Sequence, residues 1–135
     1  MKDLPPDPEL QSHFARYLCV LVSGLLESSI RNLYGQYAKK KAAPDVANFV
    51  AVQLREFQNP KMEKILDLAR AFNPLWEQEL RTTSEGALKD AVDSIVANRH
   101  RIAHGEWVGL TPATLNRYYV DAFRVIEAIA KQCDD

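Results

Sequence analysis

The sequence predicts an all-α protein, and three observations support this fold class. Apolar residues recur every three or four positions over several long stretches, which is the spacing of one face of a helix. Signals that start helices, such as Asn73-Pro74 and Thr111-Pro112, stand between these stretches. No stretch alternates apolar and polar residues over the length of a strand. We therefore expect an up-and-down helical bundle with additional short helices.

The chain is expected to form one domain. Its 135 residues match the commonest size of a single core, and 47% of them are hydrophobic. Residues 1–8 are predicted to be an extended lead-in, because Pro5, Pro6 and Pro8 disfavour helical geometry around them. The single helical domain then covers residues 9–135.

Composition limits the classes of function. A net charge of -1 argues against a monomer with broad affinity for RNA, because proteins that hold phosphates non-specifically are clearly basic. The longest apolar run, from Tyr17 to Leu26, is too short to span a membrane, and no hydrophobic signal region opens the chain. We therefore expect a cytoplasmic protein with no membrane partner, in which Cys19 and Cys133 remain thiols.

The first predicted helix runs from Glu9 to about Lys41. The apolar band along it is so wide that we expect burial against more than one neighbour. Its members are Leu10, Phe14, Tyr17, Leu18, Leu21, Val22, Leu25, Leu26, Ser29 and Leu33. Gly24 lies within the band and costs roughly 1 kcal/mol of helix propensity. A closely approaching helix would account for this glycine.

Three shorter helices are expected next. The second covers residues 45–57, the third opens with Asn59 as its cap and Pro60 as its first residue, and Asn73-Pro74 starts the fourth. The second helix carries its apolar residues on one side, and the third is expected to turn its apolar residues inward. On the second these are Val46, Phe49, Val50, Leu54 and Phe57, and on the third Met62, Ile65, Leu66, Ala69 and Phe72; the fourth carries Leu75, Trp76 and Leu80.

Two longer helices complete the predicted bundle. A capping box from Thr82 to Glu85 is expected to start the first of them, which runs to about Ala103 and ends at a glycine. A loop over residues 106–110 then leads to the last helix, which Thr111-Pro112 caps. That helix is expected to bury Leu115, Tyr118, Ala122, Phe123, Val125, Ile126 and Ile129.

One arginine lies where core residues are expected. Counting back from Arg99 in helical steps gives Ile95, Val92 and Leu88, so the guanidinium continues an aliphatic stripe. Arginine keeps its charge in proteins, so if Arg99 is buried it needs an anion, a carboxylate or a partner surface. His104 follows in the last turn of the same helix.

The run from Arg99 to His104 resembles the motif of the HEPN family of small helical domains. That motif is an arginine, a polar residue, here His100, and a histidine a few positions later, here after four intervening residues. Residues 17–31 also resemble the first helix of the RiboL-PSP-HEPN subgroup. The resemblance implies a metal-independent endoribonuclease whose partner is RNA, and a homodimer in which the two motif helices face each other. It also implies a toxin-antitoxin or phage-defence setting, with a neutralising or defence-system partner.

The chemistry suits the residue types. Histidine titrates near neutral pH and can transfer protons, while the planar fork of arginine matches phosphate oxygens. We therefore assign His104 as general acid or base and Arg99 as the phosphate-stabilising group. His100 is expected to position phosphate or the other histidine. Asn98 either forms a nearby hydrogen bond or is an ordinary surface residue, and Arg101 either steers substrate or, as we favour, is simply exposed.

Glu27 has two interpretations. It lies one turn before Arg31 in the order that favours an ion pair, so the simpler interpretation is a pair between these two side chains. The alternative is that Glu27 faces Arg99 and orients it. A purely structural interpretation of the motif also remains, in which Arg99 pairs with an acid and His104 ends the helix.

Other functional classes find little support. No cluster at metal-ligand spacing and no glycine-rich phosphate loop is found, so we expect no metal and no cofactor. Glu106 occupies a position where HEPN toxins regulated by a nucleotidyltransferase often carry a tyrosine, so that regulation is not expected. The alternative to a nuclease is a non-catalytic HEPN module for dimerisation, RNA binding or nucleotide binding.

Overall fold

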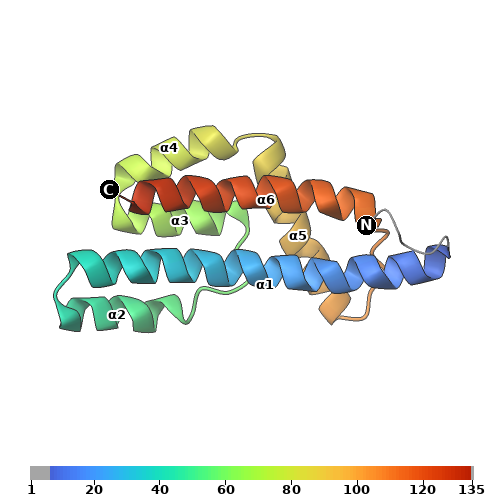
Figure 1. Cartoon of the computed structure of the whole chain (residues 1–135), viewed down its shortest axis with the longest axis horizontal. Helices are drawn as coiled ribbons and strands as arrows, with labels where there is room; N and C mark the ends of the chain where they lie inside the picture. The colour runs from blue at the N-terminus through green and yellow to red at the C-terminus, as the bar shows by residue number, and fades with distance from the viewer. Residues whose placement is uncertain (1–6, 135) are drawn as a thin grey trace.

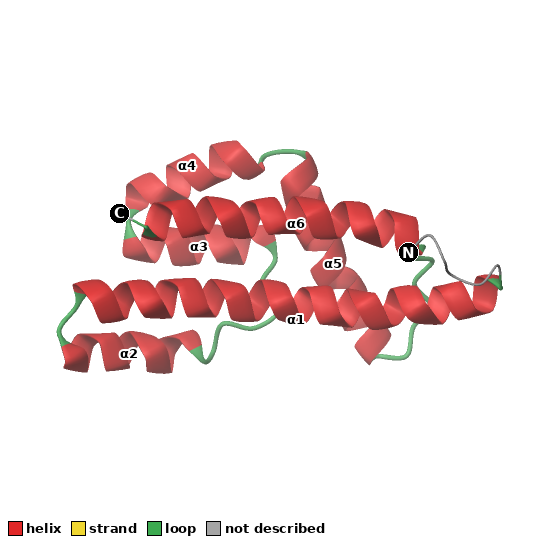
Figure 2. Cartoon of the chain, in the orientation of Figure 1, coloured by secondary structure: helices red, strands yellow, loops and turns green. Residues whose placement is uncertain are grey.

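The computed structural model describes residues 7–134 as six helices (Figure 1). They are α1 (Pro8–Lys41), α2 (Pro44–Leu54), α3 (Met62–Phe72), α4 (Pro74–Ser84), α5 (Ala87–Ala103) and α6 (Pro112–Cys133). No strand occurs in this part of the chain, as Figure 2 shows, and the predicted all-α class is confirmed. Of the expected lead-in, residues 1–6 lie outside the described residues, while Pro8 is already helical and Asp7 caps α1.

The long helices α1 and α6 lie along each other, and α5 crosses behind both of them (Figure 1). The short helix α2 folds back along the C-terminal half of α1, while α3 and α4 pack on each other and α4 also packs on α6. The C-terminal end of α5 emerges on the opposite side of α1 from α6 in this view. This crossing brings the motif-bearing end of α5 to the surface.

The core has two parts. The larger cluster joins all six helices around fully buried residues such as Ile30, Tyr34 and Ile95. A smaller cluster packs Val108 and Leu110, from the loop after α5, against the N-terminal half of α1. That loop is therefore fixed to the bundle directly after the motif.

Two predicted helix starts are confirmed by their caps. The Asn73 side chain accepts a hydrogen bond from the Leu75 amide at 2.9 Å, and Pro74 is the first residue of α4. The Thr111 hydroxyl accepts from the Thr114 amide at 3.2 Å, and α6 follows. In both cases the side chain replaces a hydrogen bond that the first turn of a helix lacks.

Asn59-Pro60 was expected to start α3, and this prediction is wrong. The helix begins at Met62, whose amide donates to the Asp93 carboxylate of α5 at 2.8 Å. Asn59 instead has a φ of 49°, a left-handed conformation that asparagine tolerates better than most residues. The same property that suits asparagine to caps also suits it to such turns.

The capping box from Thr82 to Glu85 is also wrong. Helix α4 continues to Ser84, and the Thr82 hydroxyl donates back to the Gln78 carbonyl at 3.1 Å. Gly86, with a φ of 88°, separates α4 from α5. Helix α2 likewise ends at Leu54, earlier than expected, and residues 55–56 form a turn.

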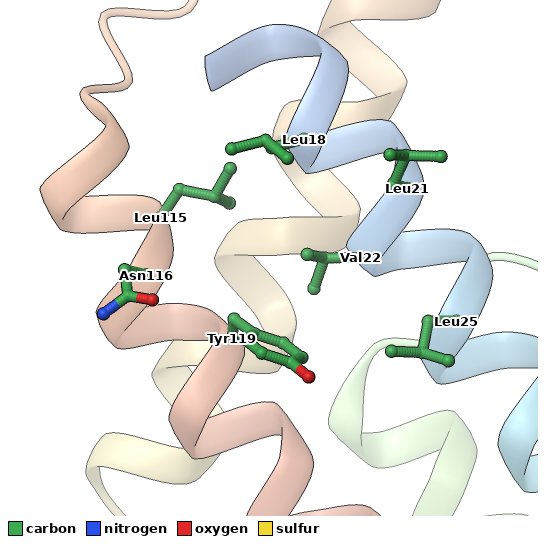
Figure 3. Close-up of a pocket in the computed structure, with 7 residues that line it drawn as sticks. All are labelled: Leu18, Leu21, Val22, Leu25, Leu115, Asn116 and Tyr119. Atoms are coloured by element: carbon green, nitrogen blue, oxygen red, sulfur yellow. The ribbon is translucent and has the colours of Figure 1, made fainter. Parts of the chain in front are cut away.

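The outer side of α1 is less covered than predicted. Tyr17 is 61% exposed, Leu21 50% and Leu25 44%, and a groove of about 310 Å³ lies between this side and α6 (Figure 3). Phe123 on α6 is also exposed, contrary to expectation, and Val46 and Phe49 on α2 are exposed as well. Across the described residues, no helix is both long enough and apolar enough to cross a membrane.

Gly24→Ala is expected to raise the free energy of unfolding by about 0.5 to 1 kcal/mol. The predicted close approach of another helix is wrong, because Gly24 is exposed and an added Cβ would meet nothing within 4 Å. Denaturant unfolding measures the change. Gly86→Ala is the matched control and should destabilise the protein, since its φ of 88° strains an alanine. A Gly24→Ala protein that unfolds more easily would contradict the prediction.

Candidate functional site

The motif occupies the last turns of α5. The helix ends after Ala103, with His104 as the C-cap residue at φ −92° and ψ 11°. Gly105 follows with a φ of 73°, the left-handed conformation that commonly ends a helix. The predicted end of this helix is therefore confirmed, and it places His104 on an exposed corner of the bundle.

Arg99 is half-buried, and its partner is an amide. Val92 and Ile95 on the same stripe are fully buried, as expected. The Arg99 Nη1 donates to Asn59 Oδ1 at 2.7 Å, across 40 residues of sequence. Among residues 7–134 no carboxylate forms an ion pair with Arg99, so its charge is not compensated by an acid. An uncompensated guanidinium beside a surface is suited to bind an anion.

The two histidines of the motif touch each other. The rings of His100 and His104 lie 4.4 Å apart between centroids and are tilted by 65°, and both residues are exposed. Residues four apart on a helix lie on the same side, so this contact follows from the spacing. It is the contact that a role for His100 in positioning the other histidine requires.

Glu27 pairs with Arg31, as the simpler interpretation predicted. Arg31 Nη2 and Glu27 Oε1 are 2.9 Å apart, and the Glu27 side chain is only 16% exposed. Arg31 also donates to two main-chain carbonyls of the α2–α3 loop, those of Phe57 at 2.9 Å and Arg55 at 3.2 Å. No contact between Glu27 and Arg99 occurs in the structure of residues 7–134, so Glu27 acts on Arg31 and the loop.

Asn98 and Arg101 have local structural contacts. The Asn98 amide donates to the Ser94 carbonyl one turn earlier at 2.8 Å, as an ordinary helix residue does. Arg101 is exposed, as favoured, and it lies 3.4 Å from the Glu106 carboxylate and donates to the Trp107 carbonyl at 3.1 Å. These bonds fix the first residues after the helix.

Cys19 contacts α5 one turn before the motif. Its thiol donates to the Ile95 carbonyl of α5 at a distance of 3.6 Å, and burial raises the pKa of Cys19 to about 11. The nearby Arg99 charge offsets part of this rise in pKa. A neutral thiol is therefore present near Arg99 at physiological pH, and it supplies no negative charge that competes with an anion for the guanidinium.

Asn59 is the site residue that the sequence did not indicate. Its position before a proline favoured a cap, and nothing local pointed to an arginine 40 residues later.

Within residues 7–134 no group of three or more histidine, cysteine or acidic side chains is placed to hold a metal ion.

Comparison with known proteins gives a match to a protein family. A family model described as RiboL-PSP-HEPN matches residues 1–135, the whole chain. No curated protein and no solved structure matches it. The match supports, in general terms, a HEPN-type nuclease or another RNA-related module. By its helical fold, its motif at the end of α5 and this full-length match, the chain belongs to the RiboL-PSP-HEPN family.

Proposed function

We propose that the protein is a metal-independent endoribonuclease of the HEPN type, which cleaves RNA at a site shared between two copies of the chain. The observation that carries the proposal is the Arg99 guanidinium, which has no acidic partner in the described residues and lies on the same end of α5 as two touching, exposed histidine rings. A cation without an acidic partner and two groups able to transfer protons are the parts that this reaction needs.

The reaction uses the RNA's own nucleophile. A histidine removes the proton of a 2′-hydroxyl, and the 2′-oxygen forms a bond to the adjacent phosphorus. The bond from phosphorus to the 5′-oxygen breaks, and a second histidine gives that oxygen a proton. The products are a 2′,3′-cyclic phosphate and a 5′-hydroxyl. Arg99 would stabilise the negative charge that develops on the phosphate oxygens.

Helix geometry favours a site built by two copies. His100 and His104 lie on the same side of α5, but Arg99 and His104 are five residues apart, which is roughly 140° around a helix axis. The arginine and the histidine of one chain therefore leave the helix in different directions. A twofold axis near the end of α5 would place the Arg99 of one copy opposite the His104 of the other. It would also collect positive charge in a chain whose net charge is only -1.

The proposal predicts specific products. In excess chelator, the purified protein is expected to cut an oligoribonucleotide and leave a 2′,3′-cyclic phosphate, because no step requires a metal or an external nucleophile. Mass spectrometry of the fragments identifies the end group. The matched control is the same oligonucleotide with a single 2′-deoxy nucleotide at the cut position, which should resist cleavage there. Fragments with a free 3′-hydroxyl, or cleavage that stops in chelator, would contradict the proposal.

A non-catalytic HEPN module is the second candidate. The exposed apolar side chains between α1 and α6, including Leu21, Leu25 and Tyr119, favour it, because such a face suits an interaction protein (Figure 3). This candidate predicts binding to RNA or a partner without cleavage. Binding of a nucleotide by Arg99 would instead raise the unfolding temperature when nucleotide is added.

The proposed setting is a toxin-antitoxin or phage-defence system with a neutralising partner. The family match supports it only through the setting that the resemblance to HEPN nucleases implies. An unregulated cut in cellular RNA would be toxic, so the proposal entails that expression without the partner slows growth.

A further inference from the structure

The loop between α2 and α3, residues 55–61, is held by several elements of the fold. From α1, Arg31 donates to the Arg55 and Phe57 carbonyls, and Glu27 fixes that arginine. From α3, the Lys64 ammonium donates to the Gln58 carbonyl at 2.7 Å. The Phe57 side chain is buried in the main core. The loop is therefore anchored on both sides of its exposed residues.

Asn59 lies in this anchored loop, and its side-chain amide faces α5. It is the one non-glycine residue with a positive φ in the part of the chain that the structure describes. This conformation carries the side chain toward Arg99, whose Nη1 donates to Asn59 Oδ1 at 2.7 Å. A guanidinium has only donors, so the amide oxygen, and not its nitrogen, must face it.

We propose that Asn59 is a positioning residue for Arg99, one that fixes the guanidinium for phosphate without neutralising it. The inference rests on the proposed nuclease function. The Asn59 oxygen accepts one N–H bond from Arg99 and carries no net charge, so the remaining donors and the full positive charge stay available to an anion. A carboxylate in the same place would hold the guanidinium equally well but would compete with phosphate for it.

The anchored loop explains why a weak, neutral contact is sufficient. A flexible loop would lose conformational entropy each time Asn59 binds Arg99, and this cost would offset the hydrogen bond. Here Glu27 and Arg31 have already fixed the main chain two and four residues before Asn59. Glu27 would thus affect the position of Arg99 only indirectly, because it fixes Arg31, which holds the loop that carries Asn59.

The first test is Asn59→Gly. Glycine adopts the observed φ of 49° without strain, so this change removes the amide and keeps the loop. We expect kcat for RNA cleavage to fall by roughly 10- to 100-fold, because a misplaced catalytic group loses its orientation. The KM should change little, since the charge of Arg99 remains. Gln58→Ala is the matched control, because its main-chain bond to Lys64 survives the change, and it should cleave as the wild type does.

The second test is Asn59→Asp, which keeps the acceptor and adds a charge. The aspartate should still hold the Arg99 guanidinium, but its negative charge would neutralise the arginine and weaken phosphate binding. We therefore expect KM to rise and kcat to fall less than in Asn59→Gly. The opposite patterns of the two variants separate positioning from a general structural role. If Asn59→Gly cleaves with wild-type kcat while cleavage still depends on Arg99, the proposal is overturned.

A readout without cleavage keeps this inference distinct from the nuclease proposal. In the wild type, the Nη1 protons of Arg99 should give a separate, slowly exchanging NMR signal, which Asn59→Gly removes and Gln58→Ala keeps. An Arg99 signal that is unchanged in Asn59→Gly overturns the positioning role, whatever the protein cleaves. A wild-type protein that shows the expected signals but cuts no RNA supports the hold on Arg99 and refutes only the nuclease.

Discussion

Arg99→Ala is expected to lower the rate of RNA cleavage by roughly 10²- to 10³-fold, the usual effect of removing one preorganised donor from a developing negative charge. The structure explains why this substitution should lower activity but not the stability of the fold. Arg99 pairs with no acid among residues 7–134, and its partner Asn59 is exposed, so truncation leaves no buried carboxylate unpaired. We expect the free energy of unfolding to change by less than about 1 kcal/mol.

Initial rates in excess chelator, with unfolding curves of each variant, provide the measurement. Arg124→Ala is the matched control, because it removes the same charge from an exposed side chain on α6 that is only weakly paired with Asp121, at 3.7 Å. Arg99→Lys should show an intermediate loss, since lysine keeps the charge but lacks the planar fork. Equal losses in Arg99→Ala and Arg124→Ala would point to general attraction of RNA. Equal residual cleavage in all variants would point to a contaminating nuclease.

The helices could be predicted from the sequence because burial repeats at the helical period. The elements that pack against each apolar face could not be predicted in this way. The spacing of Tyr17, Leu21 and Leu25 indicates an apolar side of α1, but it does not say whether another part of the same chain covers that side. In the structure α6 reaches only its edge, and these three residues stay exposed.

The sequence predicted those features of the site that depend on residues close together in the chain. The end of α5 follows from Gly105, and the pair of Glu27 and Arg31 follows from their spacing of one turn. The partner of Arg99 depends instead on a loop 40 residues earlier in the chain. Asn59 could equally cap a helix or enter a left-handed turn, and the anchoring of its loop by α1 and α3 decides between the two.

Mixing two inactive variants is expected to restore cleavage if the site is shared between copies. Arg99→Ala and His104→Ala should each be nearly inactive alone, the second because loss of an acid-base group costs roughly 10²- to 10⁴-fold. When the two proteins are mixed and allowed to exchange, each mixed dimer keeps one Arg99 and one His104, on opposite copies. Random exchange makes about half of the dimers mixed, and each holds one of two pairs, so about a quarter of wild-type activity should return.

The control replaces one partner of the mixture. Arg99→Ala mixed with the double variant, which carries both Arg99→Ala and His104→Ala, contains no arginine at the site and should stay inactive. If Arg99 and His104 of the same chain acted together, no mixed dimer would hold a complete pair and the first mixture would stay inactive too. The separation of roughly 140° between these two positions around α5 is the reason that we expect recovery. Absence of recovery, with exchange of subunits shown by mass spectrometry, would therefore refute a site that joins the arginine of one copy to the histidine of the other.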